Sequence, residues 1–327
     1  MPPALEELEH VYIELTVKCN LACSFCDNSM RNLYRDIPPE RFREIVDQLK
    51  PGTRIGLHGL GEPTLHKQLV ELVAYAKQKR MYVYFNSNHT VTREDQMRGL
   101  VENELDELRI SMSASSRETF NGYAGRDLFD DLIARARRMV EIRGDRQKPL
   151  LRAIFVLTNE NYHELPLVTK NAEDIGFDEV QVQALLDWGK DENAEDDKTA
   201  AESRYHTRMK EVRSTVATAV SQAKRIRIVV PDFLQKEIEQ SREAGSCRWP
   251  FNAMWITSDG HVTPCCNLHD PRQISLGDAF KNRVADIWLS PEYEDFRAKY
   301  RADKVEACRS CPVHYGQFKT YTYEYEK

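Results

Sequence analysis

Residues 11–26 read VYIELTVKCNLACSFC. The stretch opens with an apolar, β-branched run, which is typical of a buried strand. Cys19, Cys23 and Cys26 follow directly, spaced Cys-x3-Cys-x2-Cys. Three thiolates on one short loop can hold three irons of a [4Fe–4S] cube, which usually has four cysteine ligands. The fourth iron then stays open to a small molecule, and an open coordination position is typical of a catalytic metal site.

Other uses of three cysteines fit less well. A zinc site needs a fourth Cys or His, which His58 could supply, but the x3-then-x2 spacing is unusual for zinc. Disulfides are disfavoured because the chain is long and charged and shows no secretory signal.

The motif, with Phe25 just before its last cysteine, resembles that of the radical S-adenosylmethionine (AdoMet) enzymes. The resemblance implies that the amino and carboxylate groups of AdoMet chelate the open iron. Reductive cleavage then yields a 5′-deoxyadenosyl radical, which abstracts a substrate hydrogen. Cys19, Cys23 and Cys26 match the family motif one for one, and Phe25 matches the position that packs near the adenine.

Composition narrows the class of protein. The 327 residues suffice for one large domain and a smaller one. They are 41% hydrophobic and 30% charged, with a net charge of −6, so no global basic field points to nucleic acid or to a membrane surface. No apolar run is long enough to span a bilayer. Eight cysteines without a secretory signal indicate a reducing cytoplasm and metal ligation.

Short apolar runs alternate with amphipathic stretches, which predicts βα units and a parallel sheet with helices outside. The expected strands are His10–Val17, Arg54–His58, Met81–Asn86, Glu107–Ser113, Leu150–Leu157 and Glu179–Leu185. The expected helices are Pro39–Lys50, His66–Lys79, Arg93–Glu102, Leu128–Ile142 and His163–Ile175. Periodicity alone also allows a flat doubly wound sheet, whereas the family resemblance implies a partial (β/α)6 TIM-like barrel. Ligands lie at the carboxyl ends of the strands in both architectures.

The chain divides into two predicted domains. Residues 1–230 are expected to form the partial barrel, ending with a helix near 200–224 and a strand at 225–230. The acidic stretch DWGKDENAEDD at 187–197 is interpreted as a solvated loop or, less simply, a lid. Residues 231–327 are expected to form a small iron–sulfur domain.

A second motif, Gly59-Leu60-Gly61-Glu62-Pro63, follows the second expected strand. It resembles the family's GGEP motif, which contacts the AdoMet amino group, although Leu60 replaces the first glycine of the pair. We therefore expect Gly59, Gly61, Glu62 and Pro63 to bind the cofactor. Glu62 could instead cap the following helix.

Polar residues end the next strands. Asn86-Ser87-Asn88 partly matches a Thr-Asn-Gly turn that family members often carry. Ser111, which the resemblance places near the AdoMet carboxylate or ribose, could equally be an ordinary turn residue. Asn159, after the fifth strand, is a similar case.

Cys247, Cys265, Cys308 and Cys311 form a C-terminal set, written C-x12-G-x4-C followed by Cys-x2-Cys. This pattern, with a predicted hairpin turning at Asp-Gly, resembles the SPASM/twitch extension of radical AdoMet enzymes. Full SPASM domains carry seven cysteines; here Gln317 stands where a further one would lie. The resemblance therefore implies four ligands for one auxiliary [4Fe–4S] cluster, the twitch form. A zinc site with four cysteines would also suit the spacing.

Cys266 remains. A cysteine beside a ligand is most often a small buried hydrophobe. It could also replace Cys265 as ligand, or donate a hydrogen atom to a substrate radical as the catalytic residue of an epimerase.

The resemblance implies hydrogen abstraction by AdoMet-derived radicals but leaves the substrate open. The four-cysteine count resembles 2-deoxy-scyllo-inosamine dehydrogenase-type enzymes, so the first expectation is oxidation of a hydroxyl-bearing carbon in a carbohydrate, cyclitol or nucleoside-type small molecule. Epimerisation and maturation of a ribosomally made peptide are the alternatives; an N-terminal leader-binding domain is expected to be absent.

An electron donor such as flavodoxin or ferredoxin is the expected partner. A non-enzymatic metal scaffold and a nucleic-acid modifier are disfavoured, by the GEP-like turn and by the acidic charge. Polar candidates for substrate contacts are His58, Gln183, Asp187 and Trp188.

Overall fold

The computed structural model describes residues 7–27, 35–184, 209–231, 247–309, 311 and 320–323. Within these ranges eleven strands form one sheet, in the order β10-β9-β8-β1-β2-β3-β4-β5-β6-β7-β11. The strands are β1 His10–Ile13, β2 Arg54–Gly56, β3 Tyr82–Ser87, β4 Glu107–Ser111, β5 Leu150–Leu157, β6 Glu179–Ala184, β7 Arg227–Pro231, β8 Ala253–Ile256, β9 His261–Thr263, β10 Gly277–Asp278 and β11 Thr320–Tyr323. Neighbours from β8 through β1 to β7 pair in parallel, while β9, β10 and β11 pair antiparallel.

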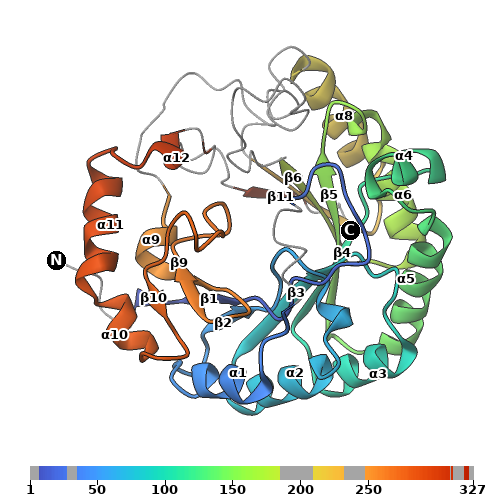
Figure 1. Cartoon of the computed structure of the whole chain (residues 1–327). Helices are drawn as coiled ribbons and strands as arrows, with labels where there is room; N and C mark the ends of the chain where they lie inside the picture. Colours follow the sequence, from blue (N-terminus) through green and yellow to red (C-terminus); the bar gives the residue numbers. More distant parts are fainter. Residues whose placement is uncertain are drawn as a thin grey trace.

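Helices surround the curved sheet as an outer ring (Figure 1). They are α1 Pro39–Val46, α2 Leu69–Gln78, α3 Glu94–Glu102, α4 Arg117–Ala124, α5 Phe129–Arg143, α6 Leu165–Ile175, α8 Met209–Gln222, α9 Trp249–Asn252, α10 Val284–Trp288, α11 Pro291–Arg301 and α12 Glu306–Arg309, with the short 3-10 turns η3 Pro63–Leu65 and η4 Tyr162–Glu164. Each long helix buries an apolar stripe against the sheet, as Phe42, Ile45 and Val46 do on α1. The predicted α/β class and the partial-barrel arrangement are confirmed.

The two faces of each inner strand differ. On β1, Val11 and Ile13 are fully buried in the apolar core between sheet and helices. His10 and Tyr12 point the other way, into the lumen of the partial barrel, as successive side chains of a strand must. The lumen is thus lined by alternate residues of β1 to β8.

Charged and aromatic side chains fill the lower end of this lumen. The Glu107 carboxylate on β4 forms an ion pair with Arg109 at 3.0 Å and another with Arg152 at 2.6 Å. Arg152 also pairs with Glu179 at 2.5 Å. The Arg109 guanidinium stacks over the Tyr84 ring, 4.1 Å from its centroid. These pairs occupy the end of the lumen opposite the carboxyl ends of the strands.

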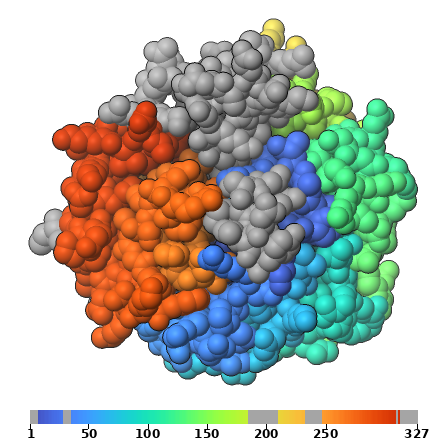
Figure 2. Space-filling view, viewed as in Figure 1, coloured from blue at the N-terminus to red at the C-terminus, as the bar shows by residue number. Residues whose placement is uncertain are grey.

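The C-terminal region continues the sheet. β8 pairs in parallel with β1, in the register His10↔Ala253 to Ile13↔Ile256, and β9 returns antiparallel to β8. The predicted hairpin is confirmed, with Gly260 at a positive φ of 91°. In Figure 2 this orange segment lies directly beside the blue N-terminal part. The boundary at residue 230 stays a prediction.

Most predicted elements lie within a few residues of the observed ones, and β5 has the bounds expected. The features that were missed include helices α4, α10 and α11, strand β11, and the parallel pairing of β8 with β1. The acidic stretch at 187–197, Leu185 and Gln317 fall outside the described residues. No helix in the described ranges is both long and apolar enough to cross a bilayer.

Candidate functional site

The three N-terminal cysteines lie on the loop that follows β1, at the carboxyl end of the barrel. Helix α4 fastens this loop: Ala22 N–H donates to Ala124 O at 3.2 Å, and Ser24 N–H donates to Tyr123 O at 2.9 Å. Phe25 packs on the Tyr123 ring, with centroids 5.0 Å apart. Inside the loop, Cys26 N–H donates to Cys23 O at 3.1 Å. The structure therefore holds all three thiols on one short, anchored loop.

The Gly59–Pro63 turn presses against the base of that loop. A Cβ on Gly61 would lie 2.1 Å from Thr16 O, and a Cβ on Gly59 would lie 2.2 Å from a Glu14 carboxylate oxygen. Glu62 N–H donates to Lys18 O at 2.7 Å. Only glycine allows this approach of two backbones, which places the turn beside the cysteine loop.

Glu62 organises the turn. Its Oε1 accepts from Thr64 N at 3.1 Å, Thr64 Oγ1 at 2.8 Å and Ser87 Oγ at 2.7 Å. Its Oε2 accepts from Asn88 N at 2.7 Å. The residue is only 2% exposed, and burial raises the pKa of its carboxyl against these four donors. Glu62 thus caps η3, the simpler of the two roles considered. Its Oε1 already accepts three hydrogen bonds and its Oε2 one, so Oε2 is the oxygen that could accept a further bond.

Asn88 connects this network to the first cysteine. Its Nδ2 donates to Cys19 Sγ at 3.8 Å and to Asn20 Oδ1 at 2.9 Å. A donor to a cluster sulfur tunes the reduction potential of that cluster. In the sequence, Asn88 belongs only to a partial match to a Thr-Asn-Gly turn, and its position after β3 is the one signal of this role.

The remaining predicted cofactor residues lie at the same edge. Pro63 is buried as the first residue of η3. Ser111 ends β4, half-buried and paired with Ile154 of β5.

Several buried polar atoms at this edge have no hydrogen-bond partner among the described residues: His58 Nδ1, Asn86 Oδ1, Asn159 Oδ1 and Trp255 Nε1. Each such atom costs about 1–3 kcal/mol if it stays unpaired. The glycine cradle and these atoms fit a polar ligand with both hydrogen-bond donors and acceptors, as AdoMet has.

Three of these side chains, His58, Asn86 and Trp255, project into the lumen; we call them the lumen triad. The register Gly56↔Tyr84 puts His58 and Asn86, each two residues further on, side by side. Tyr12 joins the third member: its ring lies 5.2 Å from that of His58 and 5.3 Å from that of Trp255. Burial, with Arg109 and His10 nearby, holds the pKa of His58 well below its usual range, so the ring is neutral.

The C-terminal cysteines gather into one group. Cys265 and Cys266 follow β9, Cys247 precedes α9, and Cys308 lies in α12 just before Cys311. Burial first, and then the thiolate charges of Cys311 and Cys247, raise the pKa of Cys308 and of Cys266 to about 12 each. The same two thiols act on Cys265, whose pKa is raised well above its usual range, mainly by burial.

Such thiols ionise only beside a compensating cation. Coordination to iron supplies that cation, so the donor set fits an iron–sulfur cluster. Each of the eight cysteines is a thiol rather than half of a disulfide. No three Cys, His, Asp or Glu side chains in the described ranges converge closely enough to hold a single metal ion.

Cys266 also lies near Tyr12 in the lumen wall. The pKa of Tyr12 is raised chiefly by burial, and the charge of a Cys266 thiolate adds to that effect. The site therefore brings the N-terminal loop, the lumen triad and the C-terminal thiols to one end of the barrel. Gln183 lies on β6 at the same end, whereas Asp187 and Trp188 fall outside the described residues.

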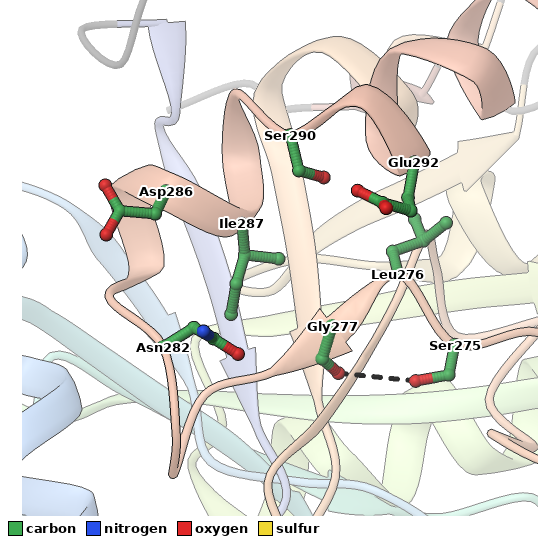
Figure 3. Close-up of a pocket in the computed structure, with 8 residues that line it drawn as sticks. All are labelled: Ser275, Leu276, Gly277, Asn282, Asp286, Ile287, Ser290 and Glu292. Carbon is green, nitrogen blue, oxygen red and sulfur yellow. Dashed lines mark hydrogen bonds between the residues drawn. The ribbon is translucent and has the colours of Figure 1, made fainter.

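A separate surface pocket of 450 Å³ lies between β10, α10 and α11 (Figure 3). Its lining includes Asn282, Asp286 and Glu292, and Ser275 Oγ donates to Gly277 O at 3.3 Å there. None of the cysteines lines it, so it is separate from the candidate site.

Comparison with known proteins gives two matching family models. The Radical SAM superfamily model matches residues 13–170, and the SPASM iron–sulfur cluster-binding domain model matches residues 247–312. The tungsten-containing aldehyde ferredoxin oxidoreductase cofactor-modifying protein of Pyrococcus furiosus is 22% identical over 94% of this chain and 88% of its own length. A PqqA peptide cyclase of Granulibacter bethesdensis is 23% identical over 91% of this chain and 78% of its own length.

Solved structures share the fold. Streptococcus suis SuiB, bound to its precursor peptide SuiA or to S-adenosylmethionine, superposes with a TM-score of 0.70 in both cases, at 15% and 17% identity. These alignments cover 93% of this chain and 70% or 71% of SuiB. BtrN in complex with AdoMet and 2-DOIA reaches 0.51 at 17% identity, covering 93% of this chain and 92% of BtrN.

Proposed function

We propose that this chain, which is a radical SAM enzyme with a SPASM domain, oxidises a carbon of a peptide substrate after hydrogen abstraction. It binds a [4Fe–4S] cluster with AdoMet and an auxiliary iron–sulfur cluster. When bound, these groups supply a 5′-deoxyadenosyl radical and a one-electron acceptor. We assign Cys19, Cys23 and Cys26 to the first cluster, and Cys247, Cys265, Cys308 and Cys311 to the auxiliary cluster.

The lumen triad is compatible with this substrate class, and the similarity to a PqqA peptide cyclase favours it. Trp255 Nε1 can only donate a hydrogen bond and Asn86 Oδ1 can only accept one, whereas the neutral His58 ring can do either. An uncharged group with both a donor and an acceptor would satisfy them, and a peptide amide is such a group. The PqqA peptide cyclase, similar over 91% of this chain, favours a peptide for the same site.

The position of the C-terminal thiols supports net oxidation. Cys266 lies close enough to Tyr12, in the lumen wall, to affect its pKa. A substrate radical formed in the lumen would thus have an electron acceptor beside it. The carbon would lose a hydrogen atom to the 5′-deoxyadenosyl radical, an electron to the auxiliary cluster and a proton to solvent. The buried, neutral His58 ring, whose Nδ1 has no hydrogen-bond partner among the described residues, would orient the substrate.

The test uses anaerobically reconstituted enzyme with AdoMet, dithionite and fractionated extract of cells that make it. The peptide fraction should increase 5′-deoxyadenosine formation, and digestion of that fraction with a protease should abolish the increase. An increase produced only by the protease-resistant, low-molecular-weight fraction would contradict the peptide proposal.

That second outcome would support the other candidate, oxidation of a hydroxyl-bearing carbon in a carbohydrate, cyclitol or nucleoside-type molecule. A hydroxyl group also donates and accepts, so the lumen triad suits it. In either case a flavodoxin or ferredoxin as electron donor, and a cytoplasmic location, belong to the proposal.

A further inference from the structure

His269 joins the two cysteine loops directly. It lies three residues after Cys266, and its Nδ1 is 3.1 Å from Cys266 O. Its Nε2 is 2.9 Å from Oδ2 of Asp27, the residue that follows Cys26. Asp27 and His269 are 242 positions apart in the sequence. One imidazole ring therefore connects the loop of the N-terminal cysteines to the loop of the C-terminal ones.

This contact is shielded from water. The side chains of His269 and Asp27 are 5% and 13% exposed. A hydrogen bond to a carboxylate is stronger in such surroundings than on the surface, where screening leaves little. Both ring nitrogens face accepting oxygen atoms, a carbonyl and a carboxylate, so the ring donates to one loop when it carries a single N–H and to both loops when it carries two.

A second link supports the same junction without touching a cysteine. Glu14 Oε1 accepts from Leu60 N at 2.9 Å, and its Oε2 accepts from Ser258 Oγ at 3.2 Å. The buried Glu14 carboxylate thus ties the Gly59–Pro63 turn to the β8–β9 hairpin. The His269–Asp27 contact spans the two cysteine loops themselves.

We propose that His269 is a positioning residue that couples the two cluster-binding loops, so that AdoMet binding at the first is transmitted to the second. The inference rests on the proposed cysteine assignments. Linkage makes the effect reciprocal: the auxiliary-cluster loop holds the AdoMet loop in its binding-competent form.

The experiment uses reconstituted full-length protein with measured iron content. AdoMet affinity, and the potential of the auxiliary cluster with and without AdoMet, are determined for wild type, His269→Ala, Asp27→Ala and the double variant. His261→Ala is the matched control, because His261 lies on β9 of the neighbouring hairpin and its Nδ1 is 3.3 Å from Ser275 Oγ. Asp27→Asn keeps an oxygen acceptor in the same place.

His269→Ala and Asp27→Ala should each bind AdoMet about five-fold or more weakly than wild type, within the usual range of coupling energies. The double variant should bind AdoMet no more weakly than either of them. AdoMet should shift the reduction potential of the auxiliary cluster in wild type, His261→Ala and Asp27→Asn. It should not shift that potential in His269→Ala or Asp27→Ala. Additive losses in the double variant, or an unchanged shift in His269→Ala, would overturn the coupling while leaving the proposed function intact. A wild-type protein without an auxiliary cluster would instead overturn the function, and the coupling with it.

Discussion

At the residue scale, the Glu62 carboxylate organises the turn beside the cysteine loop. It accepts four hydrogen bonds from Thr64, Ser87 and Asn88, and Asn88 in turn reaches Cys19. The motif GLGEP predicts a glutamate at this place. It does not predict the partners, because Ser87 and Asn88 lie 25 and 26 residues away and meet Glu62 only through the pairing of β2 with β3.

Glu62→Gln tests this role. The amide NH₂ of the new glutamine must then face one of the N–H or O–H donors of Thr64, Ser87 or Asn88. A charged hydrogen bond worth about 1.5–3 kcal/mol is therefore lost. We expect AdoMet affinity to fall roughly ten-fold or more, with iron content unchanged. Asp106→Asn is the control: Asp106 is a buried carboxylate that accepts from Val83 N at 2.8 Å, at the opposite end of the sheet. Equal AdoMet affinity in wild type and Glu62→Gln would make Glu62 a structural cap alone.

The Cys266→Ala variant tests whether the reaction ends in oxidation or in return of a hydrogen atom. If the substrate electron leaves to the auxiliary cluster, Cys266→Ala should keep forming the oxidised product. If Cys266 returns a hydrogen atom, the variant should stall, and wild type in deuterated water should place deuterium on the product carbon. Cys265→Ala, which removes a proposed ligand next to it, should lose the auxiliary cluster. Solvent deuterium in the product would refute the oxidation and favour epimerisation.

At the element scale, the sequence predicts what is local. Strand β5, LLRAIFVL, has the predicted bounds because it is an almost unbroken apolar run. Helix α4 was missed because it is short and contains Asn121 and Gly122; the signal was Ser116, whose side chain caps Thr119 N. The parallel pairing of β8 with β1 joins segments more than 240 residues apart, and no local pattern encodes it.

Gly61→Ala tests the contact between the Gly59–Pro63 turn and the cysteine loop. The new Cβ would lie 2.1 Å from Thr16 O, a backbone atom that cannot move alone. We expect a loss of about 1–3 kcal/mol in the free energy of unfolding, with weaker AdoMet binding. Gly122→Ala, on α4 with no atom within 4 Å, should instead stabilise by about 0.5–1 kcal/mol. Thermal unfolding of both variants measures this; a Gly61→Ala protein as stable as wild type would contradict the contact.

At the scale of the whole molecule, one sheet carries both sets of cysteines. The N-terminal set follows β1 and part of the C-terminal set follows β9, and β8 holds the two regions together by pairing with β1. Cysteine spacing predicted each set separately. Their juxtaposition, and the His269–Asp27 bridge between them, depend on tertiary contacts that spacing cannot report.

The central claim is that one chain holds two cysteine-bound clusters and uses the first to cleave AdoMet. Iron and 5′-deoxyadenosine, counted after anaerobic reconstitution, test it most directly. We predict about eight irons per wild-type chain, from two cubes. The triple variant Cys19/Cys23/Cys26→Ala should keep about four irons and form no 5′-deoxyadenosine, since the open iron is gone. A wild-type count near four with bound zinc, or AdoMet cleavage by the triple variant, would contradict the account.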